Sequence, residues 1–367
     1  MISLYIHIPF CQKKCFYCSF VVTVGQDRWM DAYLDCLTME AGRHQDTLVE
    51  TVYLGGGTPS YLSSGQLQKF LTSLRKKFKF AADCEWTLEA NPEGLDLEKA
   101  KLLYDLGINR VSLGVQSLND RTLKYLGRCH DAHRTRTAFQ ILRQAGFTNI
   151  NVDLLYSFPG QTDDEIKEDV LALTSLGSEH LSLYTLTLEE NSRFYARQVK
   201  LDSDENRARQ YELVVSFLES TEFKQYEISN FAKPAHASKH NLNYWQGGDY
   251  IGLGVAAHSH RGGTRFWNVS KTNVYMKRIQ KHENPSEGEE QLSAHQRLME
   301  LILFGLRMNQ GVNIEEAGQK VGGALDAARR HTIDELIGRG FLYREKDYLK
   351  ATLKGRLVLD EISSRLI

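Results

Sequence analysis

Short apolar runs alternate with amphipathic stretches through the first half of the chain. The runs have the length of β-strands, and they cover residues 4–8, 51–54, 84–89, 110–115, 149–156 and 180–186. Between them, apolar residues recur every three or four positions, which is typical of helices with one buried face. This spacing predicts helices over residues 26–44, from 63, over 97–104, on both sides of Gly127-Arg128, and over 163–176. The alternation predicts an α/β fold with a parallel sheet.

A polar residue, a cysteine or a glycine stands at the end of each predicted strand. These residues are the cysteines of residues 11–18, Gly55 to Gly57, Glu89, Gln116, Asp153 and Tyr184. An open doubly wound sheet and a curved partial barrel both fit the alternation of strands and helices. In a barrel, however, the carboxyl ends of successive strands build one site. Six such ends therefore favour a partial (β/α)6 barrel as the core, over residues 1–200.

The chain changes character after the barrel. We expect an α+β extension over residues 201–285, packed on the open edge of the barrel. Its predicted elements are a helix at 204–219 and strands at 225–228, 250–253 and 264–268. Pro285 and Gly288 lie among polar residues, which predicts a linker over residues 283–290.

The last part of the chain predicts a separate small domain over residues 290–367. Helical spacing covers residues 293–308, 314–320 and 324–339, a two-stranded segment covers 341–351, and another helix opens at Thr352. Three helices and a hairpin predict a winged-helix-like fold. From Gln291 onward there are 12 basic and 10 acidic residues without a basic stripe. A packing or partner-binding role is therefore favoured over a DNA-binding regulator.

The composition is that of an ordinary globular protein. The 367 residues carry a net charge of −1, which gives no indication of nucleic-acid binding. No signal-peptide pattern precedes the first apolar run, and no apolar segment approaches the roughly 20 residues of a membrane helix. Of the six cysteines, Cys36, Cys84 and Cys129 are scattered and favour core positions or inert thiols. This cysteine usage predicts a protein of the reducing cytoplasm.

The other three cysteines stand close together directly after the first strand. Cys11, Cys15 and Cys18 have the spacing C-x3-C-x2-C, and they follow Pro9 in one short loop. Structural zinc usually needs a second cysteine pair or histidines nearby, which are missing here, and three unrelated buried cysteines are the other alternative. Three thiolates on one loop favour a [4Fe–4S] cluster in which one iron stays open for another ligand.

This cysteine motif, with Tyr17 before the third cysteine, resembles the signature of the radical S-adenosylmethionine (radical SAM) proteins. In that family the open iron binds the amino and carboxylate groups of the methionine part of SAM. The glycine motif Gly55-Gly56-Gly57-Thr58-Pro59 resembles the family's GGTP motif. The resemblance implies that the backbone at Gly56, Gly57 and Thr58 binds the SAM amino group.

Further motifs resemble the coproporphyrinogen-oxidase-like branch of this superfamily, along nearly all of residues 1–260. They surround Glu89 in residues 88–94, Gln116-Ser117, Gly127-Arg128, Asp153 in residues 152–156, and residues 158–162. The resemblance implies that Glu89 and Arg128 contact the methionine end of SAM. It also implies that Gln116 and Asp153 bind its ribose and that Tyr5 lies beside the site. A carboxylate that accepts sugar hydroxyls and a guanidinium that pairs with a carboxylate suit these roles.

Two functions occur in this branch, and three features favour the HemW-type heme chaperones over the oxygen-independent coproporphyrinogen III oxidases. The oxidases carry a fourth cysteine where this chain has Ser19-Phe20, and they have an extension before their cysteines. Residues His240 to Trp245 also match the HNxxYW motif that is associated with heme binding. We therefore expect His240 to bind heme, because imidazole is a common axial ligand of heme iron. His236, His258 and His260 are rival ligands, and a histidine that caps a polar turn is the alternative.

The expected cofactors are thus a [4Fe–4S] cluster, SAM and heme, and the expected partners are heme-accepting proteins and an electron donor for the cluster. A dimer and a peripheral membrane contact during heme delivery are further expectations. Whether SAM is cleaved, and so whether the protein is an enzyme, stays open at the level of the sequence.

Overall fold

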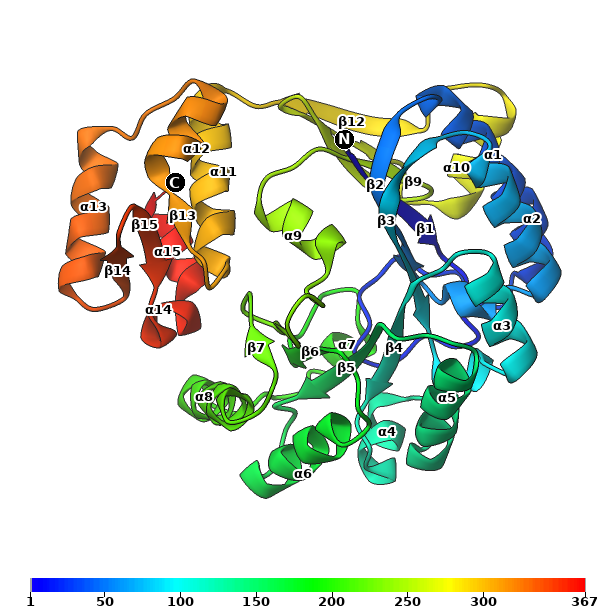
Figure 1. Ribbon diagram of the computed structural model, residues 1–367, viewed down its shortest axis with the longest axis horizontal. Coiled ribbons are helices and arrows are strands. Elements are labelled where there is room, and N and C mark those ends of the chain that lie inside the picture. Colours follow the sequence, from blue (N-terminus) through cyan, green and yellow to red (C-terminus); the bar gives the residue numbers. More distant parts are fainter. Residues whose placement is uncertain (1, 367) are drawn as a thin grey trace.

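A single mixed sheet of 12 strands forms the centre of the protein (Figure 1). The computed structural model describes residues 2–366. The strand order is β12-β11-β10-β9-β1-β2-β3-β4-β5-β6-β8-β7. Strands β9 and β1 to β6 run parallel to one another, and the pairings outside this central set are antiparallel.

Strands β1 to β6 and the helices between them confirm the predicted partial (β/α)6 barrel. The strands are β1 (Ile2–Ile8), β2 (Leu48–Gly56), β3 (Lys79–Ala90), β4 (Arg110–Gln116), β5 (Ile150–Tyr156) and β6 (His180–Thr185). The helices are α1 (Met30–Ala41), α2 (Ser64–Arg75), α3 (Leu97–Asp105), α4 (Asp120–Leu126), α5 (Ala132–Gln144) and α6 (Asp163–Thr174). Short 3-10 turns lie at Asp27–Trp29, Gly42–His44, Pro59–Tyr61 and Pro92–Gly94. These helices cover the outer face of the curved sheet, which leaves its inner face free to line the interior of the barrel (Figure 1).

Apolar side chains between the sheet and the outer helices form the main core. On β1, Leu4, Ile6 and Ile8 are fully buried, and Leu67, Phe70 and Leu71 of α2 belong to the same cluster. The 3.6-residue period of the helix and the 2-residue period of the strand bring these positions onto facing surfaces. The periodicity that predicted the elements therefore also accounts for their packing.

The extension continues the sheet on both sides of the barrel. The short helix α7 (Arg193–Ala196) follows β6 and precedes the extension. The extension comprises α8 (Asp204–Glu219), β7 (Lys224–Gln225), β8 (Asn230–Ala232), α9 (Lys239–Trp245), β9 (Tyr250–Leu253), β10 (His258–Arg261), β11 (Thr264–Asn268) and α10 (Thr272–Gln280), and β12 (Ser286–Gln291) follows it. The chain thus crosses from the β6 edge to the β1 edge through α9. Strand β9 then pairs in parallel with β1, and β10 to β12 extend that edge.

Two predictions for the extension are wrong. The linker expected over residues 283–290 contains most of β12, which pairs with β11 along Thr264–Asn268. Its residues are nearly all polar and mostly exposed, because β12 is an edge strand, so no apolar alternation marked it. The strand expected over residues 225–228 is limited to β7, and Glu227 makes only an isolated bridge with Met308.

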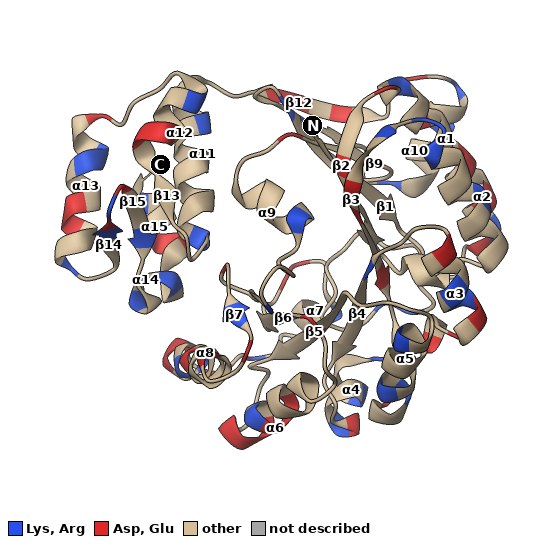
Figure 2. Ribbon diagram, viewed as in Figure 1, with Lys and Arg blue, Asp and Glu red and all other residues tan. Residues whose placement is uncertain are grey.

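The C-terminal part has its own hydrophobic core and the predicted winged-helix-like arrangement. Its elements are α11 (Ala294–Arg307), β13 (Val312–Asn313), α12 (Ile314–Val321), α13 (Ala327–Gly338), β14 (Leu342–Glu345), β15 (Tyr348–Ala351), α14 (Leu353–Leu357) and α15 (Leu359–Leu366). The core includes Leu298, Ile302, Ile333, Leu349 and Ile362. Basic and acidic residues are interspersed on the outer helices of both parts of the protein (Figure 2). Between residues 2 and 366, no helix has the length and apolarity needed to span a bilayer.

A buried carboxyl group joins the first barrel helix to the extension. Glu40 of α1 accepts hydrogen bonds from the backbone N–H of Gly254 at 2.8 Å, from Asn268 Nδ2 at 2.6 Å and from the Tyr275 hydroxyl at 2.6 Å. Burial raises the pKa of Glu40 to about 7, although these three donors favour the ionised form. The extension is therefore held partly by a group that titrates near neutral pH.

Replacement of Glu40 should change how stability depends on pH. The ordinary pKa of a glutamate is 4.5, whereas folding raises that of Glu40 to about 7. Between these values only the unfolded chain loses the proton, so stability falls by roughly 1 to 3 kcal/mol as the pH rises. Glu40→Gln should remove this component, measured as a flatter dependence of the urea midpoint between pH 5 and 7. Asp35→Asn on the exposed side of α1 is the control. Equal pH dependence in wild type and Glu40→Gln would contradict the prediction.

Candidate functional site

The cysteine loop, residues 11–22, is closed at its base by the strand that precedes it. The N–H of Thr23 donates to the Pro9 carbonyl at 2.7 Å, and the N–H of Cys11 donates to the Thr23 carbonyl at 3.2 Å. The loop thus leaves β1 and returns to its end. All three cysteines line one cavity of about 530 Å³, which we call the cluster cavity.

The three thiols are buried or partly buried, and two of them contact polar side chains from other elements. Cys11 Sγ lies 3.4 Å from Thr58 Oγ1, and Arg128 Nη1 lies 3.4 Å from Cys15 Sγ. Burial raises the pKa of Cys11 to about 12 and also raises that of Cys18. Within residues 2–366, no three Cys, His, Asp or Glu side chains converge on a single-ion site. In a four-iron cluster each thiolate binds a different iron, so three separated thiols around one cavity fit it.

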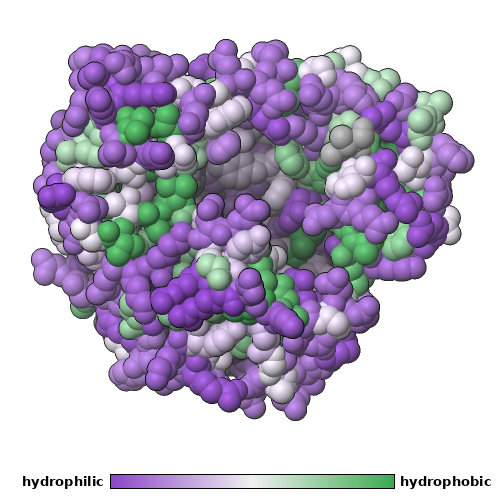
Figure 3. All heavy atoms as spheres, turned by 180° about the vertical axis from the view of Figure 1, so that it is seen from behind, coloured by the Kyte–Doolittle hydropathy of each residue, from purple (hydrophilic) through white to green (hydrophobic). Residues whose placement is uncertain are grey.

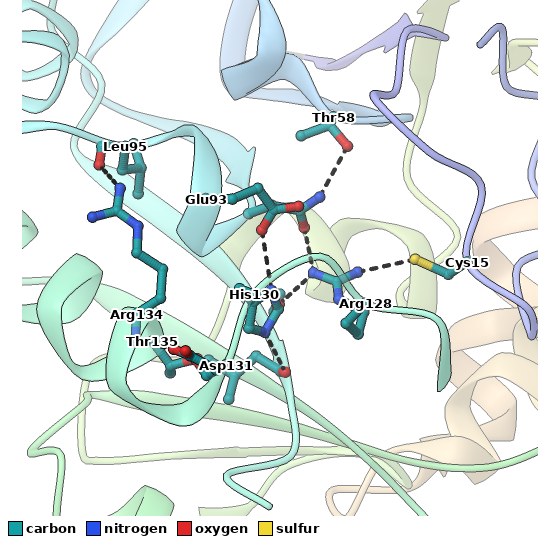
Figure 4. Close-up of polar contacts among 12 residues, drawn as sticks. Cys15, Thr58, Glu93, Leu95, Arg128, His130, Asp131, Arg134 and Thr135 are labelled. Carbon is teal, nitrogen blue, oxygen red and sulfur yellow. Dashed lines mark hydrogen bonds and ion pairs between the residues drawn. The ribbon is translucent and has the colours of Figure 1, made fainter. Parts of the chain in front are cut away.

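Arg128 connects the cysteine loop to two strand ends (Figure 4). It lies between α4 and α5, and its Nη2 donates to Asn91 Oδ1 at 2.6 Å and to the Gly114 carbonyl at 2.7 Å. Asn91 Nδ2 donates in turn to Thr58 Oγ1 at 3.2 Å, and Thr58 contacts Cys11. One polar network therefore holds two of the three cysteines in place.

The glycine motif is required where β2 passes the end of β1. The Gly57 N–H donates to the Ile8 carbonyl at 2.8 Å, and a Cβ at Gly57 would lie 2.7 Å from that carbonyl oxygen. Gly56 has a φ of 103°, which side chains rarely adopt, and a Cβ there would meet the His7 ring. Gly56, Gly57 and Thr58 line the cluster cavity, as the sequence predicted for a backbone that approaches a ligand.

Two carboxyl groups face the same cavity. Glu89 accepts from the Tyr53 hydroxyl at 2.8 Å and from the Gly56 N–H at 3.1 Å. Asp153 accepts from Asn151 Nδ2 at 2.6 Å. Burial raises the pKa of Glu89 to about 7 and that of Asp153 to about 6. Each carboxylate keeps lone pairs for further donors, so both can accept hydroxyl or ammonium groups of a ligand.

The wall of the cluster cavity is completed by the predicted residue Gln116 and by three residues that the sequence analysis did not single out. Gln116 ends β4 with a φ of 71° and lines the cavity beside Asn91. Asn91 directly follows β3. It could therefore have been predicted in the same way as Glu89, because polar residues at the carboxyl ends of barrel strands line one site. Tyr53 and Arg110 stand inside strands and had no such signal, and both line the cavity. The nearby Arg110 guanidinium partly offsets the effect of burial on Asp153.

A second cavity of about 670 Å³ adjoins the first, and we call it the aromatic cavity. It is lined by Tyr5, His7, Ser19, Phe20, Val21, Tyr53, His240, Asn241, Tyr244, Trp245, Tyr250, Ala256, His258 and Phe304. Ser19, Phe20, Tyr53 and Asn241 line both cavities. Seen from behind, the molecule is hollowed between its two lobes, with hydrophobic atoms near the margins (Figure 3).

Tyr5 and His240 lie in the wall of the aromatic cavity. The Tyr5 ring stacks on that of Tyr53, with centroids 6.3 Å apart. His240 belongs to α9 and is only 1% exposed, and both of its ring nitrogens have hydrogen-bond partners: Thr51 Oγ1 at 2.7 Å and the Tyr244 hydroxyl at 3.0 Å. Burial lowers the pKa of His240 to about 3. The HNxxYW motif thus forms a helix against the cavity, not a polar turn.

The predicted SAM-binding residues therefore gather around one cavity, except Tyr5, which lies in the adjoining wall. Of the rival histidines, His258 lines the aromatic cavity, whereas His236 and His260 line neither cavity. The roles of these SAM-site residues and histidines toward SAM and heme stay predictions.

Comparison with known proteins supports the resemblance seen in the sequence. Residues 5–173 match the model of the Radical SAM superfamily, and residues 292–358 match that of the HemN C-terminal domain. The fold is similar to the solved structure of coproporphyrinogen III oxidase (HemN) from Escherichia coli, with a TM-score of 0.87 and 25% identity. That similarity covers 100% of this chain and 89% of the other.

Curated relatives match along almost the whole chain. The chain is 36% identical to the heme chaperone HemW of Lactococcus lactis, over 96% of this chain and 94% of that protein. It is 36% identical to HemW of Bacillus subtilis, over 99% and 98%, and 33% identical to HemW of Escherichia coli, over 98% and 97%. Because these relatives match at 33–36% identity over nearly their whole length, and residues 5–173 match the superfamily model, this chain belongs to the HemW family of heme chaperones within the radical SAM superfamily.

Proposed function

We propose that this protein binds heme in the aromatic cavity and passes it to acceptor proteins. The observation that carries the proposal is the pairing of this cavity with the cluster cavity in a chain that matches HemW proteins end to end. The cavity has a volume in the range of small-molecule sites and is lined mainly by aromatic and apolar side chains. Tyrosine and tryptophan rings offer flat faces and hydrogen-bonding edges to a porphyrin.

The cluster cavity holds the second set of ligands in this proposal. Cys11, Cys15 and Cys18 bind a [4Fe–4S] cluster, which together with SAM supplies one-electron chemistry when both are bound. The backbone at Gly56 and Gly57 approaches the SAM amino group, and Glu89 and Arg128 orient the methionine end.

Gln116 and Asp153 would hold the ribose of SAM when it is bound. The Asp153 carboxylate would accept from the ribose hydroxyls and the Gln116 amide could accept or donate, while Asn151 Nδ2 donates to Asp153 Oδ1 at 2.6 Å and fixes that carboxylate. Tyr5 acts from the adjoining wall through Tyr53, on which it stacks and which donates to Glu89. Together these residues would hold SAM in the cluster cavity beside the three cysteines.

An oxygen-independent coproporphyrinogen III oxidase is the alternative function. The similarity to the HemN structure favours it, but identity to that protein is 25%, against 33–36% to the HemW proteins named above. Ser19 and Phe20 stand where the oxidases have a further cysteine. Anaerobic incubation with coproporphyrinogen III separates the two functions, because only an oxidase would yield protoporphyrinogen IX.

The remaining partners follow from the chemistry of the cargo. Heme transfer requires an acceptor protein, and a cluster that changes redox state requires an electron donor. We place the protein in the cytoplasm, where reducing conditions keep its cysteines as thiols. A dimer and a peripheral membrane contact during delivery are further parts of the proposal.

Removal of any one cluster cysteine should abolish stable cluster assembly. Cys11→Ala, Cys15→Ala and Cys18→Ala each remove one of the three thiolates proposed to bind the cluster. Iron content and the EPR signal after anaerobic reconstitution and reduction should fall to background in each variant. Cys129→Ala, at an exposed thiol, should retain the wild-type iron content. A full cluster in any of the three variants would exclude that cysteine as a ligand.

SAM affinity should depend on the protonation of Asp153. Burial raises the pKa of Asp153 to about 6, and the ionised form accepts two ribose hydroxyls, so affinity should rise as the pH increases from 5 to 7. Asp153→Asn should weaken SAM binding about tenfold and flatten this rise. Anaerobic calorimetry on the cluster-loaded protein measures both effects. Asp164→Asn at the protein surface is the control, and an unchanged pH profile in Asp153→Asn would rule out this role.

A charge at the border of the two cavities should weaken heme binding without unfolding the protein. The Phe20 side chain is 63% exposed and lines both cavities. Phe20→Asp should lower heme affinity about tenfold, because a carboxylate beside a porphyrin face must lose water. Heme titration followed by absorbance measures this change. Leu171→Asp changes a similarly exposed residue on α6 and should bind heme like wild type. Absence of saturable binding by wild-type protein would refute the function itself.

A further inference from the structure

Three histidines line the aromatic cavity: His7, His240 and His258. A heme iron can bind an imidazole only through a ring nitrogen whose lone pair is free and points to open space. The hydrogen-bond partners of the three rings therefore distinguish them as ligands.

His7 and His240 use both of their ring nitrogens within the protein. His7 Nε2 lies 2.9 Å from the Val21 carbonyl, and its Nδ1 lies 3.1 Å from the Tyr5 hydroxyl. His240 is bound in the same way between Thr51 and Tyr244. Both rings are also buried, at 5% and 1% exposure. Either histidine could reach a heme only after breaking a buried hydrogen bond and leaving its former partner unpaired.

His258 differs from both. It opens β10 at the cavity wall, it is exposed, and neither ring nitrogen has a hydrogen-bond partner among residues 2–366. Its ring stacks on Trp267, its cross-strand neighbour, with centroids 5.9 Å apart and an interplanar angle of 23°. The indole thus supports the imidazole through its face and leaves both nitrogens free. Partial burial and the nearby Arg265 lower the pKa of His258, which keeps the ring neutral at pH 7.

We propose that His258 supplies the imidazole that binds the heme iron, and that His240 is a positioning residue of the cavity wall. This inference rests on the proposed function, because it requires heme in the aromatic cavity. His240 holds α9 against the barrel. Its ring is hydrogen-bonded to Thr51 of β2, and its backbone N–H donates to Glu85 Oε1 of β3 at 3.1 Å. Its ring also orients Tyr244, which lines the cavity.

His260 provides a matched control on the same strand. It lies two residues further along β10, but its Nδ1 is 3.4 Å from Asp249 Oδ1 and its ring is tilted against Tyr250. It lines neither the cluster cavity nor the aromatic cavity. Loss of His260 thus removes an imidazole of similar surroundings without removing one from the proposed heme site.

The test is pulsed EPR of ferric heme bound to full-length, cluster-loaded protein labelled with 15N-histidine. An imidazole on the iron gives a 15N coupling in wild type, which should persist in His240→Ala and His260→Ala and vanish in His258→Ala. Heme affinity of His258→Ala should fall about tenfold or more, and added imidazole should restore it, because a small ligand can replace a lost side chain in an open wall. His258→Gln keeps the size and polarity of the side chain and should show the same loss. Circular dichroism melting curves verify that each variant is folded.

The possible failures are distinct. Wild-type protein without saturable heme binding would overturn the proposed function together with this inference. Wild-type binding with a 15N coupling that survives in His258→Ala would overturn the inference alone. A coupling lost in folded His240→Ala but kept in His258→Ala would assign the ligand to His240 and also overturn it.

Discussion

The pairing of β1 on both of its edges is the constraint on which both cavities depend. Tyr5 lies opposite Tyr53 of β2 on one side and opposite Gly252 of β9 on the other. Because the cysteine loop leaves the carboxyl end of β1, its position is fixed by the β2 register. Because β9 leads directly into β10, the same strand also fixes where His258 enters the wall. A slip of one residue would exchange the two faces of β1, placing its apolar residues in the cavity and Tyr5 against the helices.

Burial of acidic groups is the electrostatic counterpart of this arrangement. Glu89 and Asp153 lie in the barrel interior with raised pKa values, and each is held by neutral donors instead of a salt bridge. A carboxylate surrounded in this way is poorly solvated but keeps free lone pairs. Hydroxyl or ammonium groups of a ligand would therefore gain more from these carboxylates than from solvated ones at the surface. The interior is arranged to bind a polar ligand, whereas the adjoining cavity suits an apolar one.

The sequence predicted those site residues whose positions follow from the geometry of parallel strands. Glu89 and Gln116 stand at the ends of β3 and β4, and such ends converge in any barrel; Asp153 was expected at a strand end but lies in the middle of β5, where it still lines the cavity. Tyr53 and Arg110 lie within strands, where a polar residue looks the same whether it faces a cavity or a helix. The partners of His240 could not be predicted either, because Thr51 and Tyr244 meet its ring only after α9 has packed on β2. Strand β12 was missed because an exposed edge strand can be polar on both faces.

The cysteine loop links the two halves of the site physically. Its residues Ser19 and Phe20 line both cavities, while Val21 lines the aromatic cavity and bonds His7. Phe16 and Tyr17 anchor the middle of the loop against an apolar cluster that includes Leu126 and Phe194, whereas Phe20 is largely exposed. Three iron–thiolate bonds would fix the loop at Cys11, Cys15 and Cys18, and Cys18 directly precedes Ser19 and Phe20 of this shared wall. Cluster binding would therefore fix the backbone position of Ser19 and Phe20 in the wall of the proposed heme cavity, so the cluster would influence heme affinity through the backbone without touching the heme.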